Sequence, residues 1–348
     1  MAGRVIFHID VNSAFLSWTA AYRCLVLGEK TDLREIPSVI AGHQNIRTSI
    51  VLAKSIPAKR CGVKTGEPLG MARDKCPNLV VAEPDYALYV ASSRRLMALL
   101  REVSPVVEQY SIDEAWVDMT GTERLYGPPV LAANWLKGRI RRELGFTVNI
   151  GISCNKLLAK MAGDFEKPDK VHTLFPEEIP VKMWPLPVRD LLFLGKSSEK
   201  KLKEAGIRTI GDLAHEKKPK IQALLGEKAG QQLYRYARGL DDSPVKMKPD
   251  EAKGFSLETT FNDDLVSMEQ ALPILLEQCD VLAARMRRKK KKCTCISVTF
   301  RTLDFQNRSH QMKLKNATDI TDEIYFHARK LFEESWRGQP LRLLGASL

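Results

Sequence analysis

Acidic residues in two strand-like segments far apart in the chain restrict the fold of this sequence more than any other feature. Asp10 ends "RVIFHID", which alternates as a β-strand does, and Asp113 and Glu114 lie side by side in "QYSIDEAWVD" (109–118). Neighbours on a regular strand point to opposite faces, so two adjacent acids that act on one object must lie at a strand end or turn. The simpler interpretation of the pair is a polar turn between two strands.

The three carboxylates converge if the two strands are adjacent in one sheet. Like charges this close are unfavourable unless cations neutralise them. Two Mg²⁺ ions about 3.5–4 Å apart would do so, and such a pair stabilises the attacking and leaving oxygens in phosphoryl or nucleotidyl transfer. The acids therefore indicate a metal-dependent transfer site, with the polar turn as the alternative.

Composition and charge narrow the class of protein. The chain has 348 residues, enough for two to four compact units, and a net charge of +12. An excess of positive charge favours a polyanionic partner, nucleic acid above all, although a generic basic surface has the same composition.

No apolar run approaches the roughly 18–20 residues that span a membrane, and "MAGRVIFHID" enters a strand pattern without a signal-peptide core. Seven scattered cysteines without metal spacing predict reduced thiols in a cytoplasmic protein.

Periodicity predicts a multidomain α+β chain. Glycines and prolines punctuate residues 33–82, which suggests a small inserted subdomain, and four prolines in residues 176–187 mark a boundary. Short glycine-split helices follow over 188–239, and the last hundred residues alternate helix, strand, strand, helix. The first half contains predicted helices at 12–28, 85–104, 128–143 and 155–165, a hairpin at 104–119 and a strand at 147–153.

Several motifs, taken together and in order, resemble one family over essentially the whole chain. "HIDVNSAF", "YSIDEAWVDMTG", "NIGISCNKLLAKMAGDFEKP" and the glycine-split helices after residue 188 are similar to the Y-family translesion DNA polymerases of the DNA polymerase IV type. The resemblance implies a right-hand polymerase architecture with these parts: a palm of residues 1–18 and 85–174, fingers of 19–84, a helix-hairpin-helix thumb of 175–241, a linker of 242–251 and a little finger of 252–348.

The resemblance also implies a reaction and its metals. The primer 3′-hydroxyl attacks the α-phosphate of a dNTP and pyrophosphate leaves, in bypass of DNA damage and without a proofreading exonuclease. Asp10, Asp113 and Glu114 match the catalytic metal-binding carboxylates, and the backbone carbonyl of Val11 matches a further ligand. The expected cofactor is a pair of Mg²⁺ ions, with Mn²⁺ as a substitute.

Nucleotide-binding positions follow from the same resemblance. An aromatic ring under the sugar leaves no room for a 2′-hydroxyl, and Phe15 matches this steric gate; its alternative is an ordinary core aromatic. The triphosphate contacts are expected from backbone N–H groups at a helix start and from a lysine, and two apolar residues are expected over the nascent base pair. These residues are, in that order, Ser13, Ala14, Lys167, Ile50 and Leu52.

One family motif is altered in this chain. The pattern "YEARxxG" appears here as "IPAKRCG", so Ile56 replaces a tyrosine and Lys59 an arginine. The hydroxyl is lost, and the cation becomes a point charge without a bidentate fork. We expect Lys59 to contact the triphosphate, with a weaker or differently arranged grip.

Two further segments are expected to bind DNA. "LGKSSEKKL" is not a P-loop, because position 190 is Asp where that loop needs glycine. It fits a thumb hairpin that holds phosphates through Gly195, Lys196 and Ser197, with Ser197 replacing a second glycine. "RMRRKKKK" matches a little-finger segment against the DNA backbone, although a solvated helix end or a localisation patch would look the same. Its expected contacts are Arg287, Arg288, Lys289, Lys290, Lys291 and Lys292.

The expected partners are primer–template DNA and dNTP, with no membrane, and the expected state is a cytoplasmic monomer. A sliding clamp is a candidate partner, but the clamp-binding tail that family members often carry is not visible in this chain.

Two alternative functions agree with part of the sequence pattern: a palm-type nucleotidyl cyclase, and a DNA-binding scaffold without activity. The thumb-like and little-finger-like regions argue against the first, and the intact Asp10, Asp113 and Glu114 argue against the second.

Overall fold

The computed structural model describes residues 3–42, 49–248 and 251–348. Positions 1–2, 43–48 and 249–250, which belong to the expected palm, fingers and linker, lie outside the described residues. The chain divides into two compact units, one of residues 1–41 and 50–249 and one of residues 42–49 and 250–348. None of the helices in the described ranges is long and apolar enough to cross a membrane. All seven cysteines are free, as predicted.

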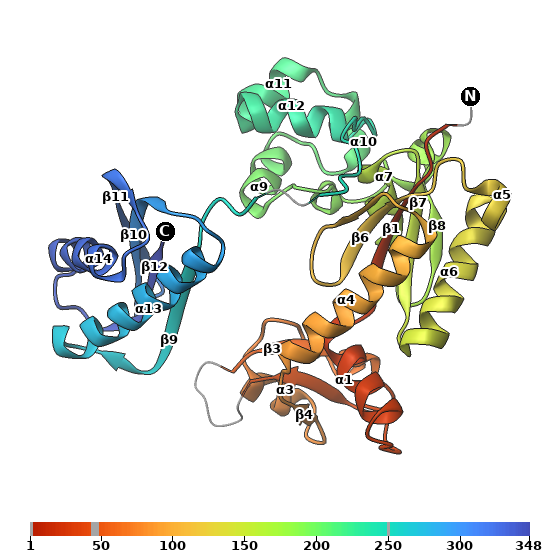
Figure 1. The fold of residues 1–348 in the computed structure, drawn as a ribbon. Coiled ribbons are helices and arrows are strands. Elements are labelled where there is room, and N and C mark those ends of the chain that lie inside the picture. The colour runs from red at the N-terminus through yellow and green to blue at the C-terminus, as the bar shows by residue number, and fades with distance from the viewer. Residues whose placement is uncertain (1–2, 43–48, 249–250) are drawn as a thin grey trace. The chain divides into compact units, whose positions relative to one another are not determined.

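A five-stranded sheet in the order β5-β6-β1-β7-β8 forms the centre of the first unit (Figure 1). The strands are β1 (Ile6–Val11), β5 (Val107–Gln109), β6 (Glu114–Asp118), β7 (Val148–Ser153) and β8 (Val171–Thr173). β1 is antiparallel to both of its neighbours, β6 and β7. The hairpin predicted between 104 and 119 is β5 and β6, so the sheet brings the segment of Asp10 beside that of the acid pair.

Helices cover both faces of this sheet. They are α4 (Tyr86–Val103), α6 (Pro129–Leu144) and α7 (Lys156–Gly163), and the short helix α5 (Glu123–Tyr126) contacts α6. Phe7 and Ile9 pack with α4 and α6, whereas Ile6 packs with Ala159 of α7. Every residue of β1 except Asp10 is therefore buried, including the polar His8.

Helix α7 approaches the sheet so closely that β7 needs a glycine. A Cβ atom on Gly151 would lie 2.0 Å from the carbonyl oxygen of Ala159 and 2.3 Å from the amide nitrogen of Gly163. No side chain fits this space. The close approach holds Lys156 and Lys160 of α7 over the strands, where Lys156 pairs with Glu108 and Lys160 with Glu114.

A second, three-stranded sheet in the order β3-β2-β4 lies beside α1 and corresponds to the predicted small subdomain. Its elements are α1 (Ala14–Leu25), β2 (Ser38–Ala41), β3 (Val51–Lys54), α2 (Ile56–Arg60), α3 (Leu69–Lys75) and β4 (Val80–Ala82). Ser13 is the N-cap of α1. β3 alternates: Val51 and Ala53 are buried, and Leu52 and Lys54 are half-buried on its other side.

Residues 174–239 form short helices, as predicted for 188–239, around a core that they share with Leu157, Leu158, Met161 and Ala162 of α7. They are α8 (Ile179–Lys182), α9 (Lys196–Glu204), α10 (Ile210–His215), α11 (Lys218–Leu225) and α12 (Glu227–Tyr236). A 3₁₀ turn, Val188–Asp190, precedes the loop that leads into α9. Residues 242–248 of the expected linker contain no helix or strand, but Val245 packs with Ile6 and Trp116 of the sheet.

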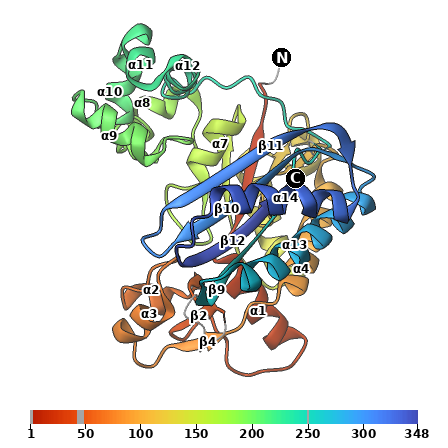
Figure 2. The ribbon, with the colours of Figure 1, turned by 90° about the vertical axis from the view of Figure 1, so that its left-hand side faces the viewer.

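The second unit is a four-stranded antiparallel sheet, β11-β10-β12-β9, with two helices on one face (Figure 2). Its elements are β9 (Ser256–Leu265), α13 (Met268–Arg288), β10 (Cys293–Thr302), β11 (Asn307–Thr318), α14 (Thr321–Ser335) and β12 (Leu341–Ser347). The prediction of helix, strand, strand, helix misses β9 and β12. β9 is a polar edge strand with mostly exposed residues, so its sequence lacks the expected alternation.

Candidate active site

A cavity of about 410 Å³ opens where β1 ends, α1 begins and β3 passes into α2. Its lining combines carboxylates, lysines and one aromatic ring, which belongs to α1. Its polar and aromatic lining includes Asp10, Asn12, Ser13, Phe15, Lys54, Lys59, Thr65, Asp113 and Lys167. The structure thus brings together residues from positions 10 to 167, most of them predicted from the sequence.

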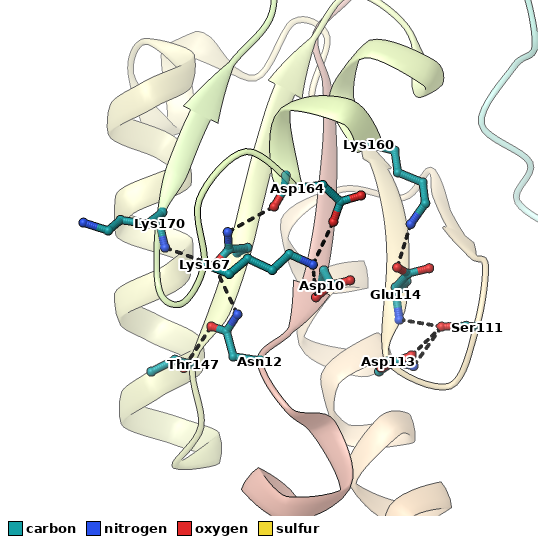
Figure 3. A network of polar contacts seen from close by, with 12 residues as sticks. Asp10, Asn12, Ser111, Asp113, Glu114, Thr147, Lys160, Asp164, Lys167 and Lys170 are labelled. Atoms are coloured by element: carbon teal, nitrogen blue, oxygen red, sulfur yellow. Dashed lines mark hydrogen bonds and ion pairs between the residues drawn. The ribbon is translucent and has the colours of Figure 1, made fainter. Parts of the chain in front are cut away.

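Asp10 and Glu114 occupy paired positions on the neighbouring strands β1 and β6. Burial and the adjacent Glu114 carboxyl raise the pKa of Asp10 to about 7, against the opposing effect of Lys167. Lys167 Nζ lies 3.0 Å from Asp10 Oδ1, and Lys160 Nζ lies 2.6 Å from Glu114 Oε1 (Figure 3). Each of the two acids therefore has one ammonium group as its counter-charge.

Asp113 lies in the hairpin turn, directly before the first residue of β6. Its backbone carbonyl accepts a hydrogen bond from the N–H of Val11 (3.1 Å), which ties the turn to the end of β1. Ser111 Oγ donates to Asp113 Oδ1 (2.6 Å) and accepts from the backbone N–H of Glu114 (3.0 Å). The acid pair thus lies where the strand begins, as predicted, and a serine fixes the turn.

The cavity receives Asp10, Val11 and Asp113, whereas Glu114 does not line it. Within residues 3–42, 49–248 and 251–348, no three His, Cys, Asp or Glu side chains are grouped as ready-made metal ligands. Lys160 and Lys167 instead contact the two facing acids.

Asn12 is a buried residue whose side chain links several segments of the site, a role that its sequence context did not reveal. Its Nδ2 donates to Asn149 Oδ1 (3.1 Å), and its Oδ1 accepts from Thr147 Oγ1 (3.0 Å) and from the backbone N–H of Asp169 (3.0 Å). These bonds join the end of β1 to the loop that carries Lys167. Lys167 also pairs with Asp164 at 2.8 Å (Figure 3). The only hint in the sequence was an uncharged polar residue two positions after Asp10.

Phe15 lines the cavity and stacks on a buried tyrosine. The ring centroids of Phe15 and Tyr89 are 4.4 Å apart, with an angle of 5° between the planes. Tyr89 is fully buried in α4, and its hydroxyl lies 3.2 Å from Thr19 Oγ1. The Phe15 ring therefore has a firm support that comes from 74 positions along the chain (15 to 89), and local sequence gave no sign of it.

Of the remaining residues predicted to bind the nucleotide, all but one line the cavity. Ser13 and Ala14 line the cavity, and Ser13 has φ 47°, a left-handed conformation that is strained for a residue with a side chain. Leu52 and Lys59 also line it. Ile50 does not: it forms an isolated bridge with Pro68 and is 43% exposed. Lys54 and Thr65 line the cavity although the sequence analysis did not single them out.

The two predicted DNA-binding segments are on the surface. Gly195 is the N-cap of α9, and Lys196 and Ser197 are exposed in its first turn. Helix α13 ends at Arg288, and all six basic residues 287–292 are exposed. Some have partners within the chain: Arg287 donates to the carbonyl of Asp319, Lys291 pairs with Glu251, and Lys292 lies 3.9 Å from Asp319.

Three family models match the chain. The impB/mucB/samB family covers residues 9–164, its C-terminal domain covers residues 252–348, and the thumb domain described for DNA polymerase-iota covers residues 189–241. The three matches follow the division into elements described above.

Curated relatives and a solved structure resemble the whole chain. A protein named DNA polymerase IV from Clostridium acetobutylicum is 48% identical over 99% of this chain and 86% of its own length. Its namesake from Alkaliphilus oremlandii is 39% identical over 99% of the chain and 85% of its own length. A solved Y-family DNA polymerase chimera matches with a TM-score of 0.84 at 22% identity, over 99% of this chain and 98% of the other, a likeness of fold.

Proposed function

The chain belongs to the Y family of DNA polymerases, and on that basis we propose that it extends a DNA primer on damaged as well as undamaged templates. The proposed reaction joins the α-phosphate of a dNTP to the primer 3′-hydroxyl and releases pyrophosphate. The observation that supports it most directly is the cavity that combines Asp10, Phe15, Lys59 and Lys167, because it offers carboxylates, an aromatic surface and cations to one ligand. No proofreading activity is proposed.

Members of this family are metal-dependent, and we propose two Mg²⁺ ions, held by Asp10, Asp113, Glu114 and the carbonyl of Val11. The donor chemistry fits, because Mg²⁺ prefers carboxylate and carbonyl oxygens. The raised pKa of Asp10 supports this assignment, since two facing carboxyls with only lysines as counter-charges gain from a divalent cation. When bound, such metals lower the pKa of the attacking hydroxyl and neutralise phosphate charge.

The chain's own residues position the nucleotide. Phe15, supported by Tyr89, would lie against the sugar and exclude a 2′-hydroxyl. Lys59 and Lys167 would contact the triphosphate, and Ser13 and Ala14 would offer backbone N–H groups to its oxygens. Leu52 would contact the nascent base pair; Ile50 stays a weaker proposal because it lies outside the cavity lining.

Duplex DNA would be held by contacts that do not read sequence. The start of α9, with Gly195, Lys196 and Ser197, and the basic run 287–292 are exposed and suited to phosphate oxygens.

We place the protein in the cytoplasm as a monomer, with a sliding clamp as a candidate partner. These three assignments have their support in the sequence and the family.

Primer extension tests the proposal. The purified protein is given a primer–template and Mg²⁺, with dNTP or rNTP, on undamaged or lesion-bearing template. We expect extension with dNTP on both templates, little with rNTP, and none by the Asp113→Ala variant. Extension by Asp113→Ala at the wild-type rate would contradict the proposed site, and a wild-type protein that extends neither template would contradict the activity.

A further inference from the structure

Lys54 reaches the candidate nucleotide cavity from the last position of β3. Val51 and Ala53 are buried on one side of the strand, and Leu52 and Lys54 line the cavity on the other. Lys54 Nζ lies 3.5 Å from the hydroxyl oxygen of Thr65, which also lines the cavity. The strand therefore directs this ammonium group toward the cavity and not only into bulk solvent.

The charge of Lys54 lacks a close counter-ion. Lys167, the third lysine of the cavity, is paired with Asp10 and Asp164. In the part of the chain that the structure describes, no carboxylate lies within ion-pair distance of Lys54 or Lys59. Burial lowers the pKa of Lys54 and the like charge of Lys59 lowers it further, while Glu67, which is itself paired with Lys75, partly opposes this effect. Such a pair of cations gains from an anion that bridges them.

The neighbouring lining leaves few other polar groups for that anion. Ile56, the first residue of α2, lines this part of the cavity and has an apolar side chain. The polar side chains of this part are Lys54, Lys59 and Thr65, with Ser55 engaged as the N-cap of α2 through the backbone N–H of Ala58. The carboxylates of Asp10 and Asp113 come from other elements, β1 and the turn before β6, so the phosphate groups farthest from the reacting centre are the ones expected here.

We propose that Lys54 binds the terminal phosphates of the incoming nucleotide together with Lys59, and that it thereby sets the affinity for dNTP. The inference rests on the proposed polymerase function and adds a residue to its binding site. The same contact would hold the pyrophosphate product. Lys54 acts in binding, so its removal should change the apparent KM more than kcat.

Single-nucleotide incorporation tests this with three variants. Lys54→Met removes the charge and keeps the chain length, Lys54→Arg restores the charge, and Lys64→Met is the control, an exposed lysine of the same subdomain outside the cavity lining. A charge-assisted hydrogen bond is worth about tenfold or more in affinity. We expect the KM for dNTP to rise about tenfold in Lys54→Met, inhibition by pyrophosphate to weaken in parallel, Lys54→Arg to recover most of both, and Lys64→Met to match the wild type.

Several results would overturn the inference. An unchanged KM in Lys54→Met would do so, and so would an equal rise in Lys64→Met, which would indicate a general field effect. Weaker binding of primer–template by Lys54→Met with normal KM would assign Lys54 to DNA instead. A second readout does not need turnover: with primer–template, dATP and Ca²⁺, amine-directed labelling of Lys54 should slow, and labelling of Lys64 should not. A wild-type protein that fails to extend primers would contradict the proposed function separately.

Discussion

Asp10 and Glu114 face each other across the antiparallel pair formed by β1 and β6. Burial and this neighbour raise the pKa of Asp10 to about 7, although Lys167 lies 3.0 Å away. The fold therefore holds an acid in a place where its ionised form is unfavourable. That arrangement lowers the stability of the folded chain near neutral pH, and it is explained if the ionised form is needed for a cation.

Replacing Asp10 by asparagine should abolish primer extension and raise the melting temperature at pH 8. The folded-state pKa of Asp10 lies above its ordinary value of 3.8, so ionisation in the folded chain is unfavourable above pH 7, and this penalty fades as the pH falls toward 4. The stability gain of Asp10→Asn should accordingly shrink by up to about 1.4 kcal/mol per pH unit between pH 7 and pH 5. Thermal unfolding without metal at several pH values measures it.

Asp164→Asn is the matched control for that experiment, because Asp164 also pairs with Lys167 but its side chain is 52% exposed. We expect it to shift the melting temperature little at any pH. A gain for Asp10→Asn that is the same at pH 5 and pH 8 would show that the Asp10 pKa is not raised.

Replacing Phe15 by alanine should relax the choice between dNTP and rNTP. The ring lines the cavity and stacks on Tyr89, so its loss opens space next to the sugar. Without the clash between the ring and the 2′-hydroxyl, we expect the dNTP/rNTP ratio of kcat/KM to fall by at least about tenfold. Tyr22→Ala, a more exposed aromatic of the same helix, should keep the wild-type ratio. An unchanged ratio in Phe15→Ala would remove the steric-gate assignment.

The positions of the candidate acids could be predicted because they depend on local sequence. An alternating strand that ends in Asp10 and a turn before Glu114 are visible without any other part of the chain. The sequence did not reveal which lysines pair with Asp10 and Glu114. Lys160 lies on a helix 46 positions after Glu114, and a helical pattern alone does not distinguish a lysine that faces a buried acid from one in solvent.

The same reason explains the other omissions. Asn12 and Tyr89 matter through partners far along the chain, and Lys54 through a cavity that five separate segments build together. In the second unit, the missed strand β12 contains Gly345, where a Cβ atom would lie 2.5 Å from the side chain of Glu258 on β9. Close approach between strands selects that glycine, and single-strand propensity disfavours it.

Replacing Gly151 by alanine should destabilise the first unit strongly. The new Cβ would overlap backbone atoms of Ala159 and Gly163, so α7 would have to move away from the sheet. Overpacking against a backbone typically costs about 1–3 kcal/mol or more. Gly138→Ala in α6 is the control: the nearest atom there is the flexible end of Arg142 at 3.3 Å, and alanine favours a helix by roughly 0.5–1 kcal/mol. Chemical denaturation compares them; equal stability of the two variants would contradict the packing described here.

Neutralising the end of α13 should weaken DNA binding and reduce its salt dependence. Arg288, Lys289 and Lys290 are exposed, and within the described residues no carboxylate pairs with them. Each phosphate contact contributes about 0.9 to the slope of log affinity against log salt concentration, so the triple glutamine variant should lose up to about 3 units of slope. Fluorescence anisotropy with labelled primer–template at several salt concentrations measures this. Lys330→Gln, which removes an exposed lysine paired with Glu334 on α14, should leave the slope unchanged. A triple variant with the wild-type slope would place these side chains in solvent and not on phosphate.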